Sequence, residues 1–347
     1  MGTTVHQNNF GALRLLFASL VILSHAPEQI DGNRSREVLT SLFGTVNFGN
    51  LAVDGFFLIS GYLITLSFYQ SDSIKNFFVR RCLRIFPAFA VASLISIFIF
   101  APMSGSWELI SKFSLMDWAK IPLKIITLQQ PWVEGAFHST KNASLFYPLN
   151  VPMWTIRWEF LCYVSVPVFA WLGLHHKKLF IMVTAISMLI FLYVTFEINY
   201  FHQEIPFLTY SLPRLFSAFL IGAGVYLFRD RMIWSNTISL VCAIALLLVF
   251  SNHYLAEPAL LVLGGYILFN FALNFKSPFL NAIGSKTDLS YGVYLYAWPI
   301  QILIILKCPT ISPWILSFYV LVLSASFAFF SWNLIEKPFM QMKRYFQ

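Results

Sequence analysis

The chain has 347 residues, of which 58% are hydrophobic and 11% are charged. Because a soluble domain carries roughly 25% charged residues, this composition excludes an ordinary soluble protein and predicts a polytopic membrane protein. The net charge of +8 does not indicate a nucleic-acid partner, since membrane proteins collect Lys and Arg on their cytoplasmic loops.

Apolar runs long enough to cross about 30 Å of hydrocarbon as helices recur along the whole chain. In chain order they fall near residues 10–26, 50–68, 83–101, 150–172, 179–197, 208–228, 233–250, 254–275, 289–306 and 312–335. They predict an all-α polytopic membrane helical bundle of about ten transmembrane helices. The first run is expected to be a retained span, because the residues before it lack the basic flank of a signal peptide. No appended soluble domain is found, so residues 1–347 are expected to form a single transmembrane domain.

The positive charges of the loops predict the orientation of the bundle. With the N-terminus in the cytoplasm, the inside loops hold Lys75, Arg80, Arg81, Arg84, Lys177, Lys178, Arg229, Arg231, Lys276, Lys286, Lys337, Lys343 and Arg344. The outside loops hold fewer, namely Arg34, Arg36, Lys112, Lys120, Lys124, Lys141 and Lys307. Both termini are therefore expected to be cytoplasmic. The long connection 102–149 is expected to be an interfacial or re-entrant segment over the outer face, either as a roof over a substrate cleft or as plain interfacial packing.

The first run carries two polar side chains whose spacing places them on one face of a helix. Arg14 and His25 are eleven residues apart, and eleven residues at ~100° each return to within ~20° of the starting direction. The two groups are then expected to lie ~16 Å apart along the helix axis. A charged residue inside a membrane span is costly and usually functional. The pattern indicates a cation near the cytoplasmic end and a proton-transfer group near the outer end of one span.

The next two runs add a carboxylate and a group of arginines. Asp54, near the outer end of the second run, either supports a site or stays hydrated at the interface. Arg80, Arg81 and Arg84 form R-R-x-x-R at the cytoplasmic mouth of the third run, and the offsets of three and four place Arg84 beside the other two. Guanidinium groups suit phosphates, although an ordinary positive-inside anchor has the same composition. Arg14 favours a phosphate site, because it adds a cation at similar depth that anchoring does not require.

Polar residues of the later runs complete the set of candidates. The fourth run enters from the outer side, so Glu159 is expected at a depth similar to that of His25. A carboxylate beside an imidazole orients the ring and stabilises the imidazolium, as in a catalytic dyad. Alternatively, His25 is an interfacial residue and Glu159 pairs locally with Arg157. Arg214, near the outer start of the sixth run, either snorkels to the interface or contacts an acceptor. Glu336 is expected in an interfacial ion pair.

Several motifs of other enzyme classes are absent from the chain. There is no Walker-type phosphate loop, no zincin helix and no G-x-S-x-G nucleophile elbow. The four cysteines are scattered through or beside the apolar runs at no metal-ligand spacing, so a structural zinc site and a disulfide framework are not expected. No metal is expected.

Six segments, taken in order, carry a family pattern. Arg14 and His25 form R-x10-H, and GNLAVDGFFLISGYLI and FFVRRCLRIFPAF follow in the next two runs. MWTIRWEFLCY contains Trp154 and Glu159, SYGVYLYAWPI contains Tyr291, and EKPF closes the series. In this order, over most of the chain, the segments resemble those of acyltransferase family 3, a family of integral membrane proteins.

One position departs from the family pattern. Ala297 stands where the family has a late His. The resemblance therefore assigns no catalytic His to the ninth run.

The resemblance implies a bacterial inner-membrane, multi-pass O-acyltransferase. Such an enzyme transfers an acyl group, usually acetyl, from cytoplasmic acyl-CoA to a hydroxyl of an extracytoplasmic carbohydrate such as an O-antigen, an exopolysaccharide or a lipid-linked sugar. Its expected partners are membrane lipid and the carbohydrate acceptor, with acetyl-CoA as the acyl donor. The oligomeric state stays open.

The resemblance also distributes roles among the candidate residues. The arginines Arg14, Arg80, Arg81 and Arg84 would hold the phosphates of CoA. His25 would act either as a general base supported by Glu159 or as a transiently acylated nucleophile. Supporting or acceptor-side roles would fall to Asp54, Trp154, Arg214 and Tyr291. The alternatives are a transporter or flippase without chemistry, against which no inverted repeat is found, and a scaffold or sensor.

Overall fold

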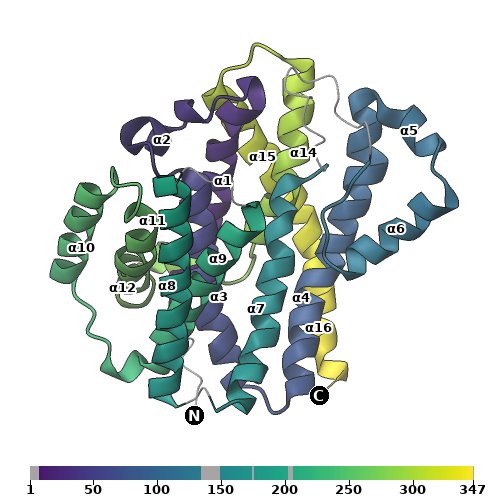
Figure 1. Ribbon diagram of the computed structural model, residues 1–347. Coiled ribbons are helices and arrows are strands. Elements are labelled where there is room, and N and C mark those ends of the chain that lie inside the picture. The colour runs from purple at the N-terminus through teal and green to yellow at the C-terminus, as the bar shows by residue number, and fades with distance from the viewer. Residues whose placement is uncertain (1–7, 134–148, 174–175, 202–205, 347) are drawn as a thin grey trace. The chain divides into compact units, whose positions relative to one another are not determined.

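The computed structural model describes residues 8–133, 149–173, 176–201 and 206–346. Within these ranges every regular element is a helix and none is a strand, as Figure 1 shows. The predicted all-α membrane bundle is confirmed. Residues 134–148, which include Lys141 of the predicted outer loops, lie outside the described ranges.

The chain divides into two compact units. Unit 1 contains residues 1–17, 38–71 and 158–286. Unit 2 contains residues 18–37, 72–157 and 287–347. Two helices, α1 (Phe10–Asp31) and α7 (Trp154–Trp171), contribute residues to both units.

Unit 1 is built on the contact between α3 (Phe48–Tyr69) and α9 (Phe207–Leu227), which lie side by side (Figure 1). A Cβ atom on Gly61 of α3 or on Gly222 of α9 would overlap a backbone carbonyl of the other helix. Glycine is therefore what allows the two backbones to approach so closely. The remaining helices of this unit are α2 (Val38–Phe43), α8 (Lys177–Phe201), α10 (Asn236–Val249), α11 (Ala256–Ala259), α12 (Gly265–Asn274) and α13 (Pro278–Ala282).

Unit 2 is built around α14 (Ser290–Lys307), whose side chains are mostly buried and which packs along α15 (Pro313–Ser331). Serine caps start its neighbours: Ser73 accepts a hydrogen bond from the backbone N–H of Asn76 at the start of α4 (Ile74–Ile95), and Ser312 does the same for Ile315 in α15. The remaining helices are α5 (Trp107–Ser111), α6 (Leu115–Ile126) and α16 (Lys337–Gln341).

Short irregular helices complete both units. π-helical turns extend α4 at Ser96–Phe100 and Pro102–Ser106, join α11 to α12 at Leu260–Gly264, and join α15 to α16 at Trp332–Glu336. 3₁₀ turns lie at Arg34–Arg36, Val151–Met153, Arg229–Arg231 and Met342–Tyr345.

Each of the ten predicted runs falls on helix. Seven segments of the described chain are long and apolar enough to span a membrane, namely Phe10–Ile30, Phe48–Tyr69, Ile74–Gly105, Lys177–Phe201, Phe207–Leu227, Ala256–Asn274 and Pro313–Arg344. The other three predicted runs fall on α7, α10 and α14, of 18, 14 and 18 residues. At 1.5 Å per residue α10 rises only about 21 Å, which is less than the hydrocarbon thickness.

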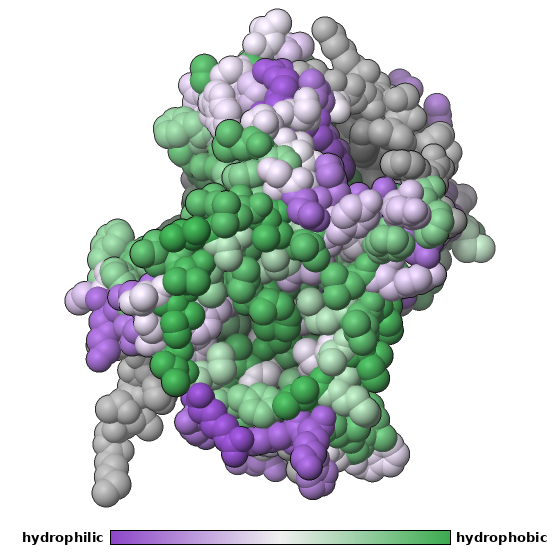
Figure 2. All heavy atoms as spheres, turned by 60° about the vertical axis from the view of Figure 1, so that its left-hand side comes forward, coloured by the Kyte–Doolittle hydropathy of each residue, from purple (hydrophilic) through white to green (hydrophobic). Residues whose placement is uncertain are grey.

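Apolar side chains cover much of the outer surface of unit 1. Leu189 on α8 and Leu248 on α10 are among many large hydrophobic residues that are exposed. Figure 2 shows such side chains gathered over a broad part of the visible face. A surface of this kind suits contact with lipid rather than water.

Candidate active site

His25 lies on α1 within unit 2 and is held by a carboxylate on the next turn. Its Nδ1 atom is 3.1 Å from Oε2 of Glu28, and the two side chains are 24% and 21% exposed. Because an ionised carboxylate only accepts, this hydrogen bond places a proton on Nδ1, and in a neutral imidazole the lone pair is then on Nε2. Glu28 also binds the Nη2 atom of Arg34 at 2.6 Å. The result is an oriented imidazole of the kind that serves as a general base.

The His25 ring also meets an aromatic partner from α14. Its centroid lies 5.0 Å from that of the Trp298 ring, and the two planes meet at 81°. Trp298 is buried, and among the described residues its indole Nε1 atom has no hydrogen-bond partner. Its neighbour Ala297, which stands where the family pattern has a late His, is buried as well. A buried donor without an acceptor, beside a candidate base, calls for a chemical explanation.

Glu28 was not among the residues predicted from sequence. Its spacing of three residues from His25 on one helix is the signal that could have found it, because such residues are neighbours on a helix surface.

Arg84 on α4 binds two carboxylates from distant parts of unit 2. Its Nη2 atom lies 2.6 Å from Oδ2 of Asp288, and its Nη1 atom lies 3.1 Å from Oε2 of Glu336. The guanidinium carbon also lies 5.7 Å from the ring centre of Tyr291 and 5.6 Å from that of Trp332. Three of the sequence segments that carry the family pattern thus meet at this one side chain.

The surroundings of Arg84 are ordered by further hydrogen bonds. Asp288 accepts from the backbone N–H and the hydroxyl of Ser290 at the start of α14. The Tyr291 hydroxyl donates to the carbonyl of Ile85 at 3.1 Å. Glu336, predicted in an interfacial ion pair, is fully buried and accepts from Ser331. Tyr291 therefore lies against Arg84.

The other predicted phosphate-binding arginines are half-buried. Arg80 and Arg81 lie on α4 in unit 2. Arg14 lies near the start of α1 in unit 1. A joint phosphate site of all four side chains therefore stays a prediction.

Glu159 on α7 is bound within unit 1. It accepts hydrogen bonds from the Ser60 hydroxyl at 3.0 Å and from the Tyr163 hydroxyl at 2.6 Å. Ser60 belongs to the second-run segment of the family pattern, so α3 and α7 are joined through their own motif residues. His25 belongs to the other unit, and its predicted pairing with Glu159 stays a prediction.

Asp54 and Arg214, both predicted as supporting or acceptor-side residues, form an ion pair in the interior of unit 1. The Arg214 Nε atom lies 3.2 Å from Oδ1 of Asp54, and its Nη1 atom lies 3.5 Å from Oε1 of Glu257. Asn50 donates to the same Glu257 oxygen at 2.7 Å. All three charged residues are buried. Glu257 was missed from sequence, because nothing in its local spacing indicates a partner on α9.

Trp154, the last of the predicted supporting residues, is the first residue of α7 and is half-buried. The following residue, Thr155, shares a hydrogen bond of 2.7 Å with the hydroxyl of Tyr294 on α14. The start of α7 is thereby fixed to α14 within unit 2.

For metals, no group of three or more His, Cys, Asp or Glu side chains that could hold an ion occurs in the described ranges.

Comparison with known proteins identifies relatives over nearly the full length. The family model described as Acyltransferase domain, of acyltransferase family 3, matches residues 8–333. An O-acetyl transferase of Shigella phage Sf6 is 29% identical over 348 residues, covering 97% of each chain. Nodulation protein 10 of Rhizobium leguminosarum bv. viciae is 27% identical over 362 residues, covering 97% of this chain and 94% of that protein.

A partial relative adds to this pattern. Acyltransferase MdmB of Streptomyces mycarofaciens is 26% identical over 159 residues, which is 44% of this chain and 36% of that protein. No solved structure matches the chain.

Proposed function

The chain belongs to acyltransferase family 3, and on that premise we propose that it moves an acetyl group from cytoplasmic acetyl-CoA to a hydroxyl of an extracytoplasmic carbohydrate. The acceptor would be an O-antigen, an exopolysaccharide or a lipid-linked sugar, and the protein would act in the bacterial inner membrane. The observation that supports this most is the imidazole of His25 on a membrane-spanning helix, with Nδ1 held by Glu28 at 3.1 Å. Family membership sets aside the transporter alternative without chemistry.

The proposed reaction needs a general base and a group that stabilises the oxyanion of the tetrahedral intermediate. The Nε2 atom of His25 takes the proton of the carbohydrate hydroxyl while the hydroxyl oxygen attacks the thioester carbonyl. The tetrahedral intermediate then collapses, the carbon–sulfur bond breaks, and the imidazolium returns the proton to the CoA thiolate. Glu28 stabilises the imidazolium between these steps. Attack by Nε2 itself, to give an acyl-His25, is the alternative course.

Trp298 is proposed to stabilise the oxyanion. Its buried Nε1–H has no partner among the described residues and its ring lies against that of His25. A hydrogen-bond donor that is already desolvated and fixed needs little further desolvation or reorientation when an oxyanion develops beside it. This role would explain why α14 needs no His at position 297.

The donor is proposed to bind through the arginines at the cytoplasmic ends of α1 and α4. Arg80 and Arg81 would contact CoA phosphates, with Arg14 closer to the thioester arm. Arg84 would act chiefly by ordering this region, because its guanidinium already binds Asp288 and Glu336. The distance of ~16 Å between Arg14 and His25 along one helix is similar to the length of the pantetheine arm of CoA. Glu159, Asp54 and Arg214 would support the acceptor side.

The function is tested by the masses of surface glycans from cells with and without the gene. We expect an acetyl increment on a sugar only when the wild-type protein is present. His25→Ala should abolish the increment while the protein still inserts. His253→Ala is the matched control, since His253 is exposed and engages its neighbour Asn199 through its backbone carbonyl. Acetylation at the wild-type level by His25→Ala would refute the assigned role.

A further inference from the structure

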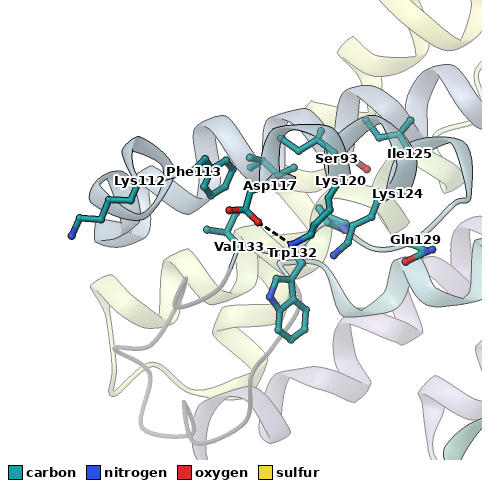
Figure 3. A pocket seen from close by; sticks show the side chains of 13 residues that line it. Ser93, Lys112, Phe113, Asp117, Lys120, Lys124, Ile125, Gln129, Trp132 and Val133 are labelled. Atoms are coloured by element: carbon teal, nitrogen blue, oxygen red, sulfur yellow. Dashed lines mark hydrogen bonds and ion pairs between the residues drawn. The ribbon is translucent and has the colours of Figure 1, made fainter. Parts of the chain in front are cut away.

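Unit 2 contains a cavity of about 510 Å³ between the C-terminal part of α4, helix α6 and residues 129–133. Figure 3 shows the side chains that line it. The polar ones are Ser93, Lys112, Asp117, Lys120, Lys124 and Gln129, and the indole of Trp132 forms part of the wall. None of these residues is among those described above around His25 or Arg84.

The cavity carries an excess of positive charge. Three lysines and one carboxylate line it, and the carboxylate, Asp117, already binds Lys120 at 3.0 Å. Hydrogen bonds from Ser114 and the pairing with Lys120 lower the pKa of Asp117 to about 2, so it stays ionised at neutral pH.

Lys124 is a partly buried cation of the cavity that Asp117 does not neutralise. Burial and the neighbouring charge of Lys120 lower the pKa of Lys124. No carboxylate pairs with it in the described part of the chain, and its Nζ atom lies 5.7 Å from the ring centre of Trp132. A partly desolvated cation is stabilised by an anion that enters beside it.

The cavity also offers the groups that hold a sugar ring. The indole of Trp132 is 37% exposed, and an aromatic face suits the apolar C–H face of a pyranose while nearby polar groups bind its hydroxyls. Gln129 supplies an amide with both a donor and an acceptor.

Ser93 provides an independent indication that a ligand enters. It is 1% exposed, and its hydroxyl has no hydrogen-bond partner among the described residues. By contrast, Ser96 on the next turn donates to the carbonyl of Ala92 at 2.8 Å. A buried hydroxyl left unpaired is destabilising, and a hydroxyl or anionic oxygen of a ligand in the cavity would satisfy it.

The outer face of α6 indicates the depth of the cavity in the membrane. Leu115 is 90% exposed and Ile126 is 68% exposed, whereas Asp117, Lys120 and Lys124 of the same helix line the cavity. An amphipathic helix with its apolar face outward lies in the plane of a membrane interface. The cavity would then open at the level of lipid headgroups, where a membrane-linked glycan carries its phosphates.

We infer that this cavity is the acceptor-binding site, and that it selects a carbohydrate carrying a negative charge, either a carboxylate on the sugar or a phosphate that links the sugar to lipid. The inference rests on the proposed function for its acceptor role. It adds that the acceptor is anionic, and that Lys124, Trp132 and Ser93 recognise it.

Binding to the full-length protein in lipid nanodiscs tests the inference without any chemistry. The probes are trigalacturonic acid and its neutral methyl ester for the sugar carboxylate, and undecaprenyl diphosphate-linked sugar and inorganic pyrophosphate for the phosphate. The wild-type protein should bind at least one anionic glycan, and bind the methyl ester about tenfold more weakly than the acid if the carboxylate is the recognised group. Tighter binding of the lipid-linked sugar would identify the phosphate instead.

Variants locate the binding in the cavity. Lys124→Gln should weaken binding of the preferred anionic glycan by about tenfold, as expected for loss of one charge-assisted contact. Lys124→Arg should retain most of it. Lys307→Gln, which removes an exposed lysine at the end of α14, should leave it unchanged. Trp132→Ala should weaken binding of charged and neutral glycans alike.

The outcomes separate this inference from the proposed function. Absence of saturable binding of every anionic probe by the wild-type protein, or an unchanged affinity in both Lys124→Gln and Trp132→Ala, overturns the inference even if cells acetylate their glycans. Binding that follows the predicted pattern without any acyl transfer supports the cavity and refutes the proposed reaction.

Discussion

Replacing Glu28 by Gln should impair acyl transfer by weakening the support of the imidazolium at His25. The variant keeps the size of the side chain and removes its charge, at a contact of 3.1 Å to Nδ1. A hydrogen bond to a charged group contributes about 1.5–3 kcal/mol. Both side chains are about a quarter exposed, so we take a value near the lower end, about 2 kcal/mol. That value corresponds to a roughly 30-fold fall in kcat.

The assay is release of the CoA thiol, with the acceptor glycan present, by the protein in lipid nanodiscs. Arg34→Gln serves as a graded control, because Arg34 is 71% exposed and binds Glu28 from the solvent side. An exposed ion pair contributes at most about 1 kcal/mol, so this variant should lose less than about fivefold. The KM for acetyl-CoA should stay within about twofold of the wild-type value in both variants, since neither residue is proposed to contact the donor.

A third variant, Glu159→Gln, identifies the partner of the base. If Glu28→Gln leaves kcat unchanged while Glu159→Gln abolishes transfer, the support for His25 comes from Glu159, as the sequence interpretation has it, and the mechanism built on Glu28 is wrong.

Four further predictions follow from single contacts. Trp298→Phe should lower kcat about 100-fold, the usual effect of losing one oxyanion donor, with little change in the KM for acetyl-CoA. Arg84→Ala should lower the free energy of unfolding by about 3–5 kcal/mol, because it leaves two carboxylates without their cation. Gly61→Ala should prevent folding through overlap with α9, whereas Gly265→Ala, which has ordinary contact distances, should fold. Arg214→Met should lower the free energy of unfolding by about 3–5 kcal/mol. Glu257→Gln should be tolerated, since it leaves the pair of Arg214 and Asp54, which has no net charge.

Each of these predictions has a direct measurement. Single-turnover kinetics with labelled acetyl-CoA test the first, and a kcat equal to that of the wild type would exclude an oxyanion role for the indole. Thermal unfolding in detergent, followed by circular dichroism, tests the other three. Equal unfolding temperatures for Arg84→Ala and wild type, correct folding of Gly61→Ala, or a Glu257→Gln variant less stable than Arg214→Met would each contradict the corresponding contact.

The helices could be predicted from sequence because hydropathy over a long run is a strong local signal. Arg14 and His25 do lie on one continuous helix, as their spacing predicts. The predicted run is longer than α10, since the apolar residues at its two ends, Ile233 and Phe250, lie outside the helix. Hydropathy does not distinguish an apolar residue beside a helix from one within it.

The partners of the candidate residues were harder to predict. Arg84 was found by its motif, but its binding of Asp288 and Glu336 depends on how α4, α14 and the end of α15 pack, which local spacing does not encode. The same holds for Glu257, which reaches Arg214 only through the packing of α11 near α9. Glu28 is the exception, because its position one turn from His25 is visible in the sequence.

The most direct test of the account is the transfer of labelled acetyl from acetyl-CoA to acceptor glycan by the purified protein in lipid nanodiscs, followed by mass spectrometry of both molecules. The account predicts that the label moves to the glycan with the wild-type protein and with His253→Ala, and stays on CoA with His25→Ala. Labelled glycan produced at the wild-type rate by His25→Ala, or no transfer to any glycan by the wild-type protein, would contradict it.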